Sequence, residues 1–111
     1  MNVQSASYSS TRATRAVPTN VQQGASSAVI SFDVPGVHFA DILLFSRGQE
    51  LTLEATLGAG TNELVELLSV VRLPEEYDVS ESEAVLYAGS LTVTSPRVRQ
   101  KVRIIEVNYV A

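Results

Sequence analysis

The segment A-V-L-Y-A-G-S-L-T-V, residues 84–93, decides the class of the fold. It holds two strand-like runs, Ala84–Tyr87 and Ser90–Thr94, on either side of the Ala88-Gly89 pair. Glycine tolerates the backbone of a tight turn, so the chain can reverse direction here. Leu91 and Val93 are two positions apart, the spacing that puts side chains on one face of a strand. We therefore expect two neighbouring strands with these two side chains in the core.

The same alternation extends outward along the chain. In Glu50–Leu57, leucine or alanine occupies every second position, and threonine or glutamate occupies the others. Further apolar runs follow at roughly ten-residue spacing, with no convincing helix. The pattern predicts an all-β fold, an immunoglobulin-like antiparallel β-sandwich of seven to eight strands. The other predicted strands are Val29–Val34, Asp41–Ser46, Leu64–Leu73 and an extended segment at Val98–Val110.

The run Leu64–Leu73 allows two interpretations. Several of its apolar residues are three or four positions apart and also fit one face of a helix. The β-branched pair Val70-Val71 and the strand-like neighbours on both sides favour a strand.

The first 26 residues differ in composition from the rest. They are rich in Ser, Thr, Gln, Asn and Ala and contain few apolar anchors. Such a segment cannot bury enough apolar surface to offset its ordering entropy. The sequence therefore predicts a flexible N-terminal arm at residues 1–26, a folded domain at 27–97 and a C-terminal extension at 98–111.

Charge and composition narrow the function. The 111 residues carry a net charge of −4, an acidic balance that argues against nucleic-acid binding. Cysteine is absent, and no stretch approaches the roughly 18 apolar residues of a membrane span or the apolar core of a signal peptide. We expect a cytoplasmic protein that binds neither nucleic acid nor membrane. The one basic cluster occupies alternate positions and is interpreted as a solvated face at a sheet edge: Arg97, Arg99, Lys101 and Arg103.

Three short motifs stand in order along the folded part. They are a Pro-Gly corner after a strand, a Leu-Pro stop at the end of another, and a small residue four positions before an Ala-Gly-x-Leu-x-Val run. Together they resemble the α-crystallin domain of the small heat-shock proteins, over roughly Val29–Pro96. Ala88 occupies a position where that family often has a polar residue. The residues that carry the resemblance are Pro35, Gly36, Leu73, Pro74, Ala84, Gly89 and Leu91.

The resemblance implies an ATP-independent holdase chaperone. Such a protein binds unfolding client proteins, limits their aggregation, and assembles as a homo-oligomer, a dimer or larger. It needs no cofactor. An alternative on the same fold is a non-chaperone structural or adaptor module, such as a CS-domain-like co-chaperone or an assembly scaffold, because fold does not fix function.

The resemblance also assigns subunit contacts. Ile105-Glu106-Val107 is similar to the family's Ile-x-Ile/Val tail motif, in which two apolar side chains dock on a neighbouring subunit. The receiving groove is expected between the strands around Ile42–Leu44 and Ala84–Tyr87. Its lining side chains are expected to be Ile42, Leu44, Val85 and Tyr87. The alternative is that the tail adds one more strand to its own sandwich, through Val102, Ile104 or Ile105.

The loop Gly58–Glu63 is too short for the exchanged strand that bacterial and plant members use to dimerise. Animal-type members instead pair one long strand edge to edge with its twin. We hypothesise that Leu64–Leu73 pairs in this way. The residues assigned to this contact are Leu64, Val65, Leu67 and Leu68.

No catalytic or metal site is expected. His38 is the single histidine, and with no cysteine a metal site would need several carboxylates around it. We interpret His38 as a surface residue of a turn. The acidic pairs Glu75-Glu76 and Glu81-x-Glu83 are interpreted as solvated loop charges rather than acid–base groups. We therefore expect no enzymatic activity.

Overall fold

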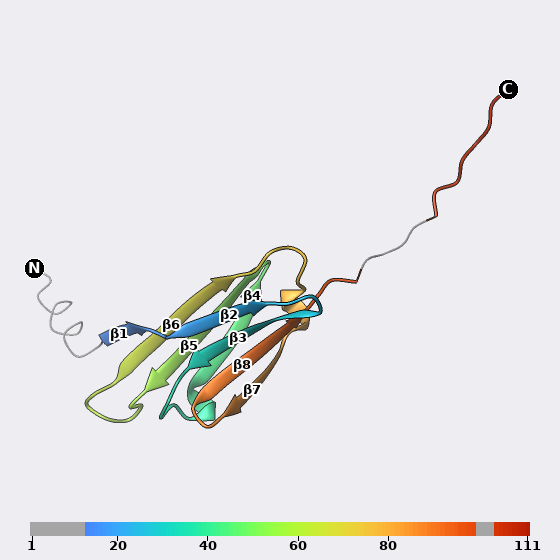
Figure 1. Ribbon diagram of the computed structural model, residues 1–111. Helices are drawn as coiled ribbons and strands as arrows, with labels where there is room; N and C mark the ends of the chain where they lie inside the picture. Colours follow the sequence, from blue (N-terminus) through green and yellow to red (C-terminus); the bar gives the residue numbers. More distant parts are fainter. Residues whose placement is uncertain (1–12, 100–103) are drawn as a thin grey trace, which may run out of the picture.

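The computed structural model describes residues 13–99 and 104–111, and its strands form two four-stranded sheets packed face to face (Figure 1). This confirms the predicted all-β sandwich. The first sheet has the spatial order β1 (Ala13–Ala16), β6 (Val65–Arg72), β5 (Glu50–Leu57), β4 (Ile42–Arg47). The second has the order β2 (Thr19–Gln23), β3 (Ser27–Asp33), β8 (Ser90–Pro96), β7 (Glu83–Tyr87). Two short 3-10 helices, η1 (Phe39–Asp41) and η2 (Val79–Glu81), precede β4 and β7.

Side chains from the inner faces of both sheets fill the core. Ile30 and Phe32 of β3 are fully buried, as are Leu53 of β5 and Val93 of β8. On β5, the residues that alternate with the buried leucines, Thr52 and Glu54, face outward, as the period of two requires. Burying each large apolar side chain stabilises the fold by about 1.5–3 kcal/mol, so this alternation supplies most of the driving force.

The strand interpretation of Leu64–Leu73 is confirmed. β6 pairs antiparallel with β5 along its whole length, from Val65 opposite Leu57 to Arg72 opposite Glu50. Leu73 follows it into the core at 2% exposure, and Pro74 ends the run.

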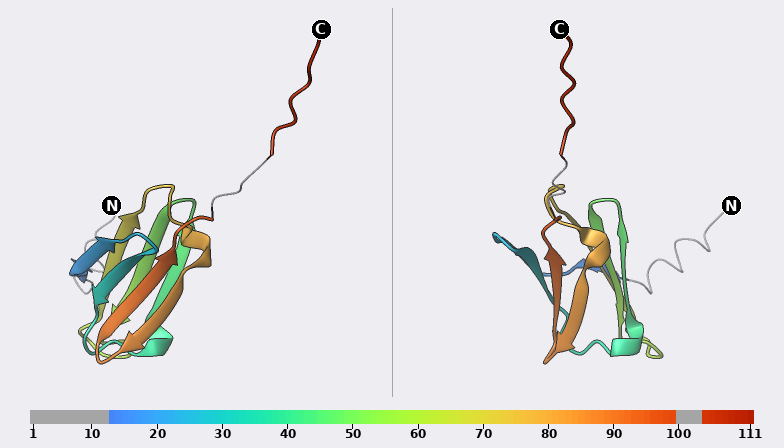
Figure 2. Two further views of the ribbon diagram at one scale, coloured as in Figure 1. Left: turned by 45° about the vertical axis from the view of Figure 1, so that its right-hand side comes forward. Right: turned by 90° about the vertical axis from the view of Figure 1, so that its right-hand side faces the viewer.

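Two strands form in the segment that was expected to be a flexible arm. β1 pairs parallel with β6, and β2 pairs antiparallel with β3, so the chain crosses from one sheet to the other between them (Figure 2). Val17 lies at this crossing and is 6% exposed. Residues 13–23 therefore belong to the sandwich, which corrects the expected arm boundary at residue 26. Few apolar side chains suffice here, because the edges of β6 and β3 supply backbone partners. Residues 1–12 lie outside the described part of the chain.

Candidate docking edge and tail

β4 and β7 are the outermost strands of their sheets and lie on the same side of the sandwich (Figure 2). η2 contacts β4 and leads into β7, so it holds the two strands together at one end. Within residues 13–99, no further strand pairs with the outer edge of either one. Edge strands of this kind offer backbone N–H and C=O groups to an incoming segment.

On β4, two of the predicted groove residues face the interior. Ile42 lies opposite Ala55 and Leu44 opposite Leu53, and both partners are buried. Residues directly opposite each other in a sheet share a face, so Ile42 and Leu44 point inward. Both are partly buried against the core, and they line the inner side of this edge.

On β7, the predicted groove residues are on the wrong face. Val85 lies opposite Thr92 and Tyr87 opposite Ser90, on the outer side of the sheet, and they are 64% and 79% exposed. The inward residues are Ala84 and Leu86, which lie opposite the buried Val93 and Leu91. Residues 84–87 are all apolar, so the sequence does not indicate which face of this strand is buried. A register shift of one residue moves every side chain to the other face of the sheet.

Ala84 shows that this edge is open. Its side chain is on the inner face, yet the residue is exposed. An inward alanine on a closed edge would be covered by the opposite sheet. The inner side of β7 is therefore accessible at Ala84. Other inward side chains of the two edge strands are apolar and pack against the core: Ile42, Leu44 and Leu86.

The described part of the tail, residues 104–111, extends away from the sheets without forming a strand (Figure 1). Ile105 is 83% exposed and Val107 is 88% exposed. Ile104 and Ile105 therefore do not complete the sandwich of their own chain, which was the alternative interpretation. Val102 lies outside the described residues. Because residues two apart share a face in an extended segment, Ile105 and Val107 present one apolar surface to solvent.

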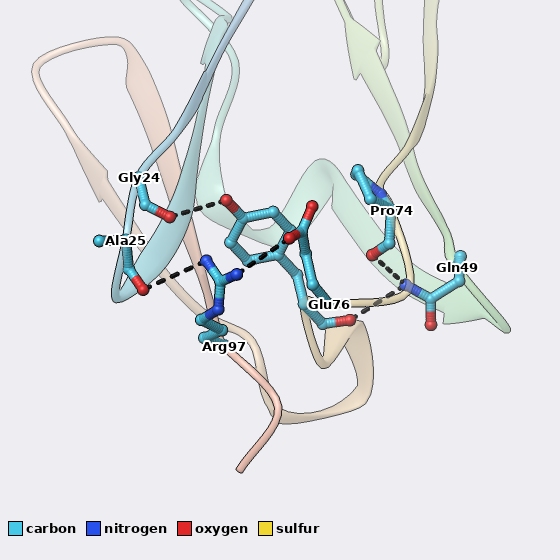
Figure 3. A network of polar contacts seen from close by, with 7 residues as sticks. Gly24, Ala25, Gln49, Pro74, Glu76 and Arg97 are labelled. Carbon is cyan, nitrogen blue, oxygen red and sulfur yellow. Dashed lines mark hydrogen bonds and ion pairs between the residues drawn. The ribbon is translucent and has the colours of Figure 1, made fainter. Parts of the chain in front are cut away.

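The root of the tail is held by contacts that the sequence did not reveal. Arg97 donates hydrogen bonds to the Ala25 carbonyl oxygen (3.3 Å) and to the Glu76 carboxylate (3.0 Å), as Figure 3 shows. Tyr77 is 3% exposed, and its hydroxyl donates to the Gly24 carbonyl oxygen over 2.7 Å. The Arg97 guanidinium lies 5.9 Å from the centre of the Tyr77 ring. These contacts join the β2–β3 turn, the loop before η2 and the start of the tail.

Gln49 completes this end of the sandwich. Its side-chain amide donates to three carbonyl oxygens, those of Leu73 (3.3 Å), Pro74 (2.8 Å) and Tyr77 (3.0 Å). Figure 3 shows the last two contacts. The backbone amide of Leu73 in turn donates to the Gln49 carbonyl oxygen over 2.9 Å. The sequence gives no indication of these contacts, because the partners of Gln49 are 24 to 28 positions away.

The edge needed for the hypothesised β6 dimer is occupied. β1 pairs with β6 from Ala13 opposite Val65 to Ala16 opposite Leu68. The four assigned residues also lie on different sides. Leu67 is buried, Leu68 is 43% exposed on the outer face, and Leu64 precedes the strand. Within the chain, β1 thus lies on the part of the β6 edge where the hypothesised pairing would take place, and the pairing of 64–68 between copies stays a prediction.

The described part of the chain contains neither a cluster of metal ligands nor a membrane-spanning helix. Among residues 13–99 and 104–111, no group of three or more His, Cys, Asp or Glu side chains is arranged to hold a metal ion. His38 is exposed in the turn before η1. No helix in the described chain has the length and apolar character needed to cross a membrane.

Comparison with known proteins gives matches in structure alone. No protein-family model matches the sequence, and no curated protein matches it significantly. Heat shock protein 16.0 from Schizosaccharomyces pombe superposes with a TM-score of 0.70 at 18% identity, over 86% of this chain and 76% of that one. A small heat-shock protein from Xylella fastidiosa gives 0.68 at 18% identity, over 84% and 96%. The rat alpha crystallin domain gives 0.62 at 16% identity, over 78% and 96%.

These similarities confirm, at the level of the fold, the resemblance that the three motifs indicated. The protein has the α-crystallin fold, the fold of the small heat-shock proteins.

Proposed function

We propose that this protein is an ATP-independent holdase that acts in the cytoplasm, binds unfolding proteins and assembles as a homo-oligomer. The observation that carries the proposal is the pairing of two complementary features. The tail presents Ile105 and Val107 at 83% and 88% exposure, and the β4–β7 edge presents inward apolar side chains beside an exposed Ala84. Apolar surface of this kind is stabilised when another apolar segment covers it.

In this proposal, the tail of one copy docks on the β4–β7 edge of another. The docking side chains are Ile105 and Val107, and the receiving side chains are Ile42, Leu44, Ala84 and Leu86. An unfolding client offers similar extended apolar segments and competes for the same edge. Binding to unfolded protein lowers the concentration of free aggregating chains by mass action, so no nucleotide is needed. We assign no catalytic step to the protein.

The test is suppression of heat-induced aggregation of a model client, without ATP, together with the mass of the assembly by light scattering. We expect the full chain to suppress aggregation and the Ile105→Asp/Val107→Asp variant to form smaller assemblies. Ile104→Asp is the matched control. It is 97% exposed on the opposite face of the tail and should leave the assembly unchanged. Failure to suppress aggregation at any mass ratio contradicts the holdase proposal.

The second candidate is an adaptor or scaffold module that binds one folded partner. The strand β1 favours it, because it covers part of the β6 edge and so removes one route to a large assembly. A single-chain mass that does not depend on the tail, combined with no suppression of aggregation, would support the adaptor.

A further inference from the structure

We propose that the outer face of the β4–β5–β6 sheet binds the same face of a second copy of this chain. The surface is distinct from the tail and from the β4–β7 edge. The inference rests on the self-association included in the proposed function, and it names an interface that the tail does not use.

The first observation is apolar exposure on this face. Leu43 on β4 and Leu68 and Val70 on β6 are 55%, 43% and 55% exposed, and Phe45 on β4 is half-buried beside them. The strand register places Leu43, Glu54 and Leu68 in one row, and Phe45, Thr52 and Val70 in the next. The apolar surface forms one strip along β4 and one along β6, with Thr52 and Glu54 of β5 between the two strips.

The outer face of the opposite sheet has a different distribution of apolar side chains. Its exposed large apolar residues, Val85 and Tyr87, lie on the edge strand β7 alone. The β4–β5–β6 face carries exposed apolar residues on two strands, β4 and β6, with the polar residues of β5 between them.

The second observation is the order of charges along the strands. β4 and β6 run in the same direction, because each is antiparallel to β5. Along both strands the charge changes from acidic to basic: Asp41 precedes β4 and Arg47 ends it, and Glu66 lies near the start of β6 and Arg72 ends it. Two further carboxylates lie on this face: Glu54 between Leu43 and Leu68, and Glu50 between Arg47 and Arg72, 3.7 Å from Arg72. The face is therefore acidic at one end and has a smaller net positive charge at the other.

This order selects one arrangement of two copies. If the two-fold axis runs along the strands, the acidic end of one copy faces the acidic end of the other, and like charges repel. If the two-fold axis instead lies in the plane of the interface and runs perpendicular to the strands, the acidic end of each copy faces the basic end of the other. In that arrangement Asp41 faces Arg47 of the second copy, Leu43 faces Phe45, Leu68 faces Val70, and Glu66 faces Arg72. A self-complementary surface is what a two-fold interface requires.

A hollow at the acidic end gives this arrangement a place for a side chain. It measures about 530 Å³ and is lined on the outer face by Asp41, Leu43, Glu54, Glu66 and Leu68. A basic or aromatic side chain from the second copy, such as Arg47 or Phe45, has the chemistry to enter it. Within the described residues, no ion pair engages Asp41 or Arg47, so both charges are available for a contact between copies.

The size of the face sets the expected strength. Three strands about 4.8 Å apart and up to eight residues long cover roughly 400 Å² per copy. This is smaller than a standard specific interface, so the dimer should be weak and depend on protein concentration.

The test is sedimentation equilibrium over a concentration series in the Ile105→Asp/Val107→Asp background, which removes tail docking. We expect a monomer–dimer equilibrium there. Leu68→Asp should abolish it, because it places a second carboxylate beside Glu54 in the interface. Val85→Asp, on the outer face of the other sheet and 64% exposed, is the matched control and should leave it unchanged.

A charge swap separates the interface from a folding defect. Asp41→Arg and Arg47→Asp should each weaken the dimer by about tenfold or more, since each turns two symmetric attractions into repulsions. The double variant Asp41→Arg/Arg47→Asp restores opposite charges and should recover the affinity. A mass of one chain at all concentrations overturns the inference, as does a double variant no better than the singles.

A different occupant would also be visible. If a labelled Lys- and Leu-containing peptide binds the chain through Leu68 while the mass stays that of one chain, the face serves a cationic partner and the inference is wrong. Loss of aggregation suppression with an intact dimer contradicts the holdase proposal instead and leaves the inference standing.

Discussion

The backbone amide of Val34 donates a hydrogen bond to the carbonyl oxygen of Gly89 over 2.8 Å. This bond joins the Pro-Gly corner after β3 to the hairpin between β7 and β8. Gly89 also passes so close to the corner that an added Cβ would lie 3.2 Å from Pro35 Cα. The backbone of Gly89 has a φ of 80°, and Ala88 before it has 50°, as a two-residue hairpin turn requires. Two of the three sequence motifs, the Pro-Gly corner and the Gly89 hairpin, are therefore in direct contact in the fold.

Gly89→Ala should destabilise the fold by about 2 kcal/mol, because left-handed backbone strain and the contact with Pro35 act together. Gly60→Ala is the matched control. Gly60 has nearly the same φ, 82°, but nothing lies within 4 Å of its added Cβ, so only the strain remains. Urea denaturation of both variants measures the difference. Equal losses would show that the close approach to Pro35 costs nothing.

Tyr77→Phe should lower the free energy of unfolding by about 1 kcal/mol, because it removes a buried hydroxyl donor and leaves the Gly24 carbonyl oxygen without it. Tyr87→Phe, which removes the hydroxyl of a side chain 79% exposed, should change the free energy by less than about 0.5 kcal/mol. Thermal unfolding of the two variants makes the comparison. If Tyr77→Phe is as neutral as Tyr87→Phe, the contact with Gly24 does not hold the β2–β3 turn.

Gln49→Glu should destabilise the protein by about 2 kcal/mol at neutral pH, because a carboxylate then faces carbonyl oxygens instead of donating to them. The repulsion raises the pKa of the introduced carboxyl in the folded state above its unfolded value of about 4.3. The folded state then binds more protons, so the free energy of unfolding falls as pH rises above about 4.3.

Denaturation of this variant at a series of pH values, each referred to the unchanged protein, checks the sign of that dependence. Gln22→Glu on the exposed strand β2 is the control and should show little dependence on pH. A loss for Gln49→Glu that is the same at pH 4 and pH 7 would mean that its side chain does not face these carbonyl oxygens.

Ala84→Asp should prevent tail-dependent assembly, because it puts a charge on the inner side of the β4–β7 edge where Ile105 and Val107 are proposed to dock. Val85→Asp, one residue along and on the outer face, should leave assembly intact. Light scattering of the full chain reads out both. If Val85→Asp prevents assembly and Ala84→Asp does not, the tail docks on the outer face of β7 instead.

The sequence alone determined which residues alternate and where the chain turns. In β5, leucine or alanine at every second position identified both the strand and its buried face, because the period of two is a local property of an extended chain. The stop at Leu73-Pro74 and the turn at Gly89 were readable for the same reason, since proline and glycine restrict or free their own backbone.

Only the tertiary structure decided what each strand pairs with and which face is covered. β1 and β2 carry little apolar pattern of their own, and they form because the edges of β6 and β3 accept them. In β7 four consecutive residues are apolar, so the sequence does not show which of them face inward. The pairing of Ala84 with Val93 determines that Ala84 and Leu86 do. The contacts of Gln49, Tyr77 and Arg97 have no signal in the sequence, because their partners are distant along the chain. A periodic pattern is local, whereas an edge, a face and a hydrogen-bond partner depend on chain segments that folding brings together.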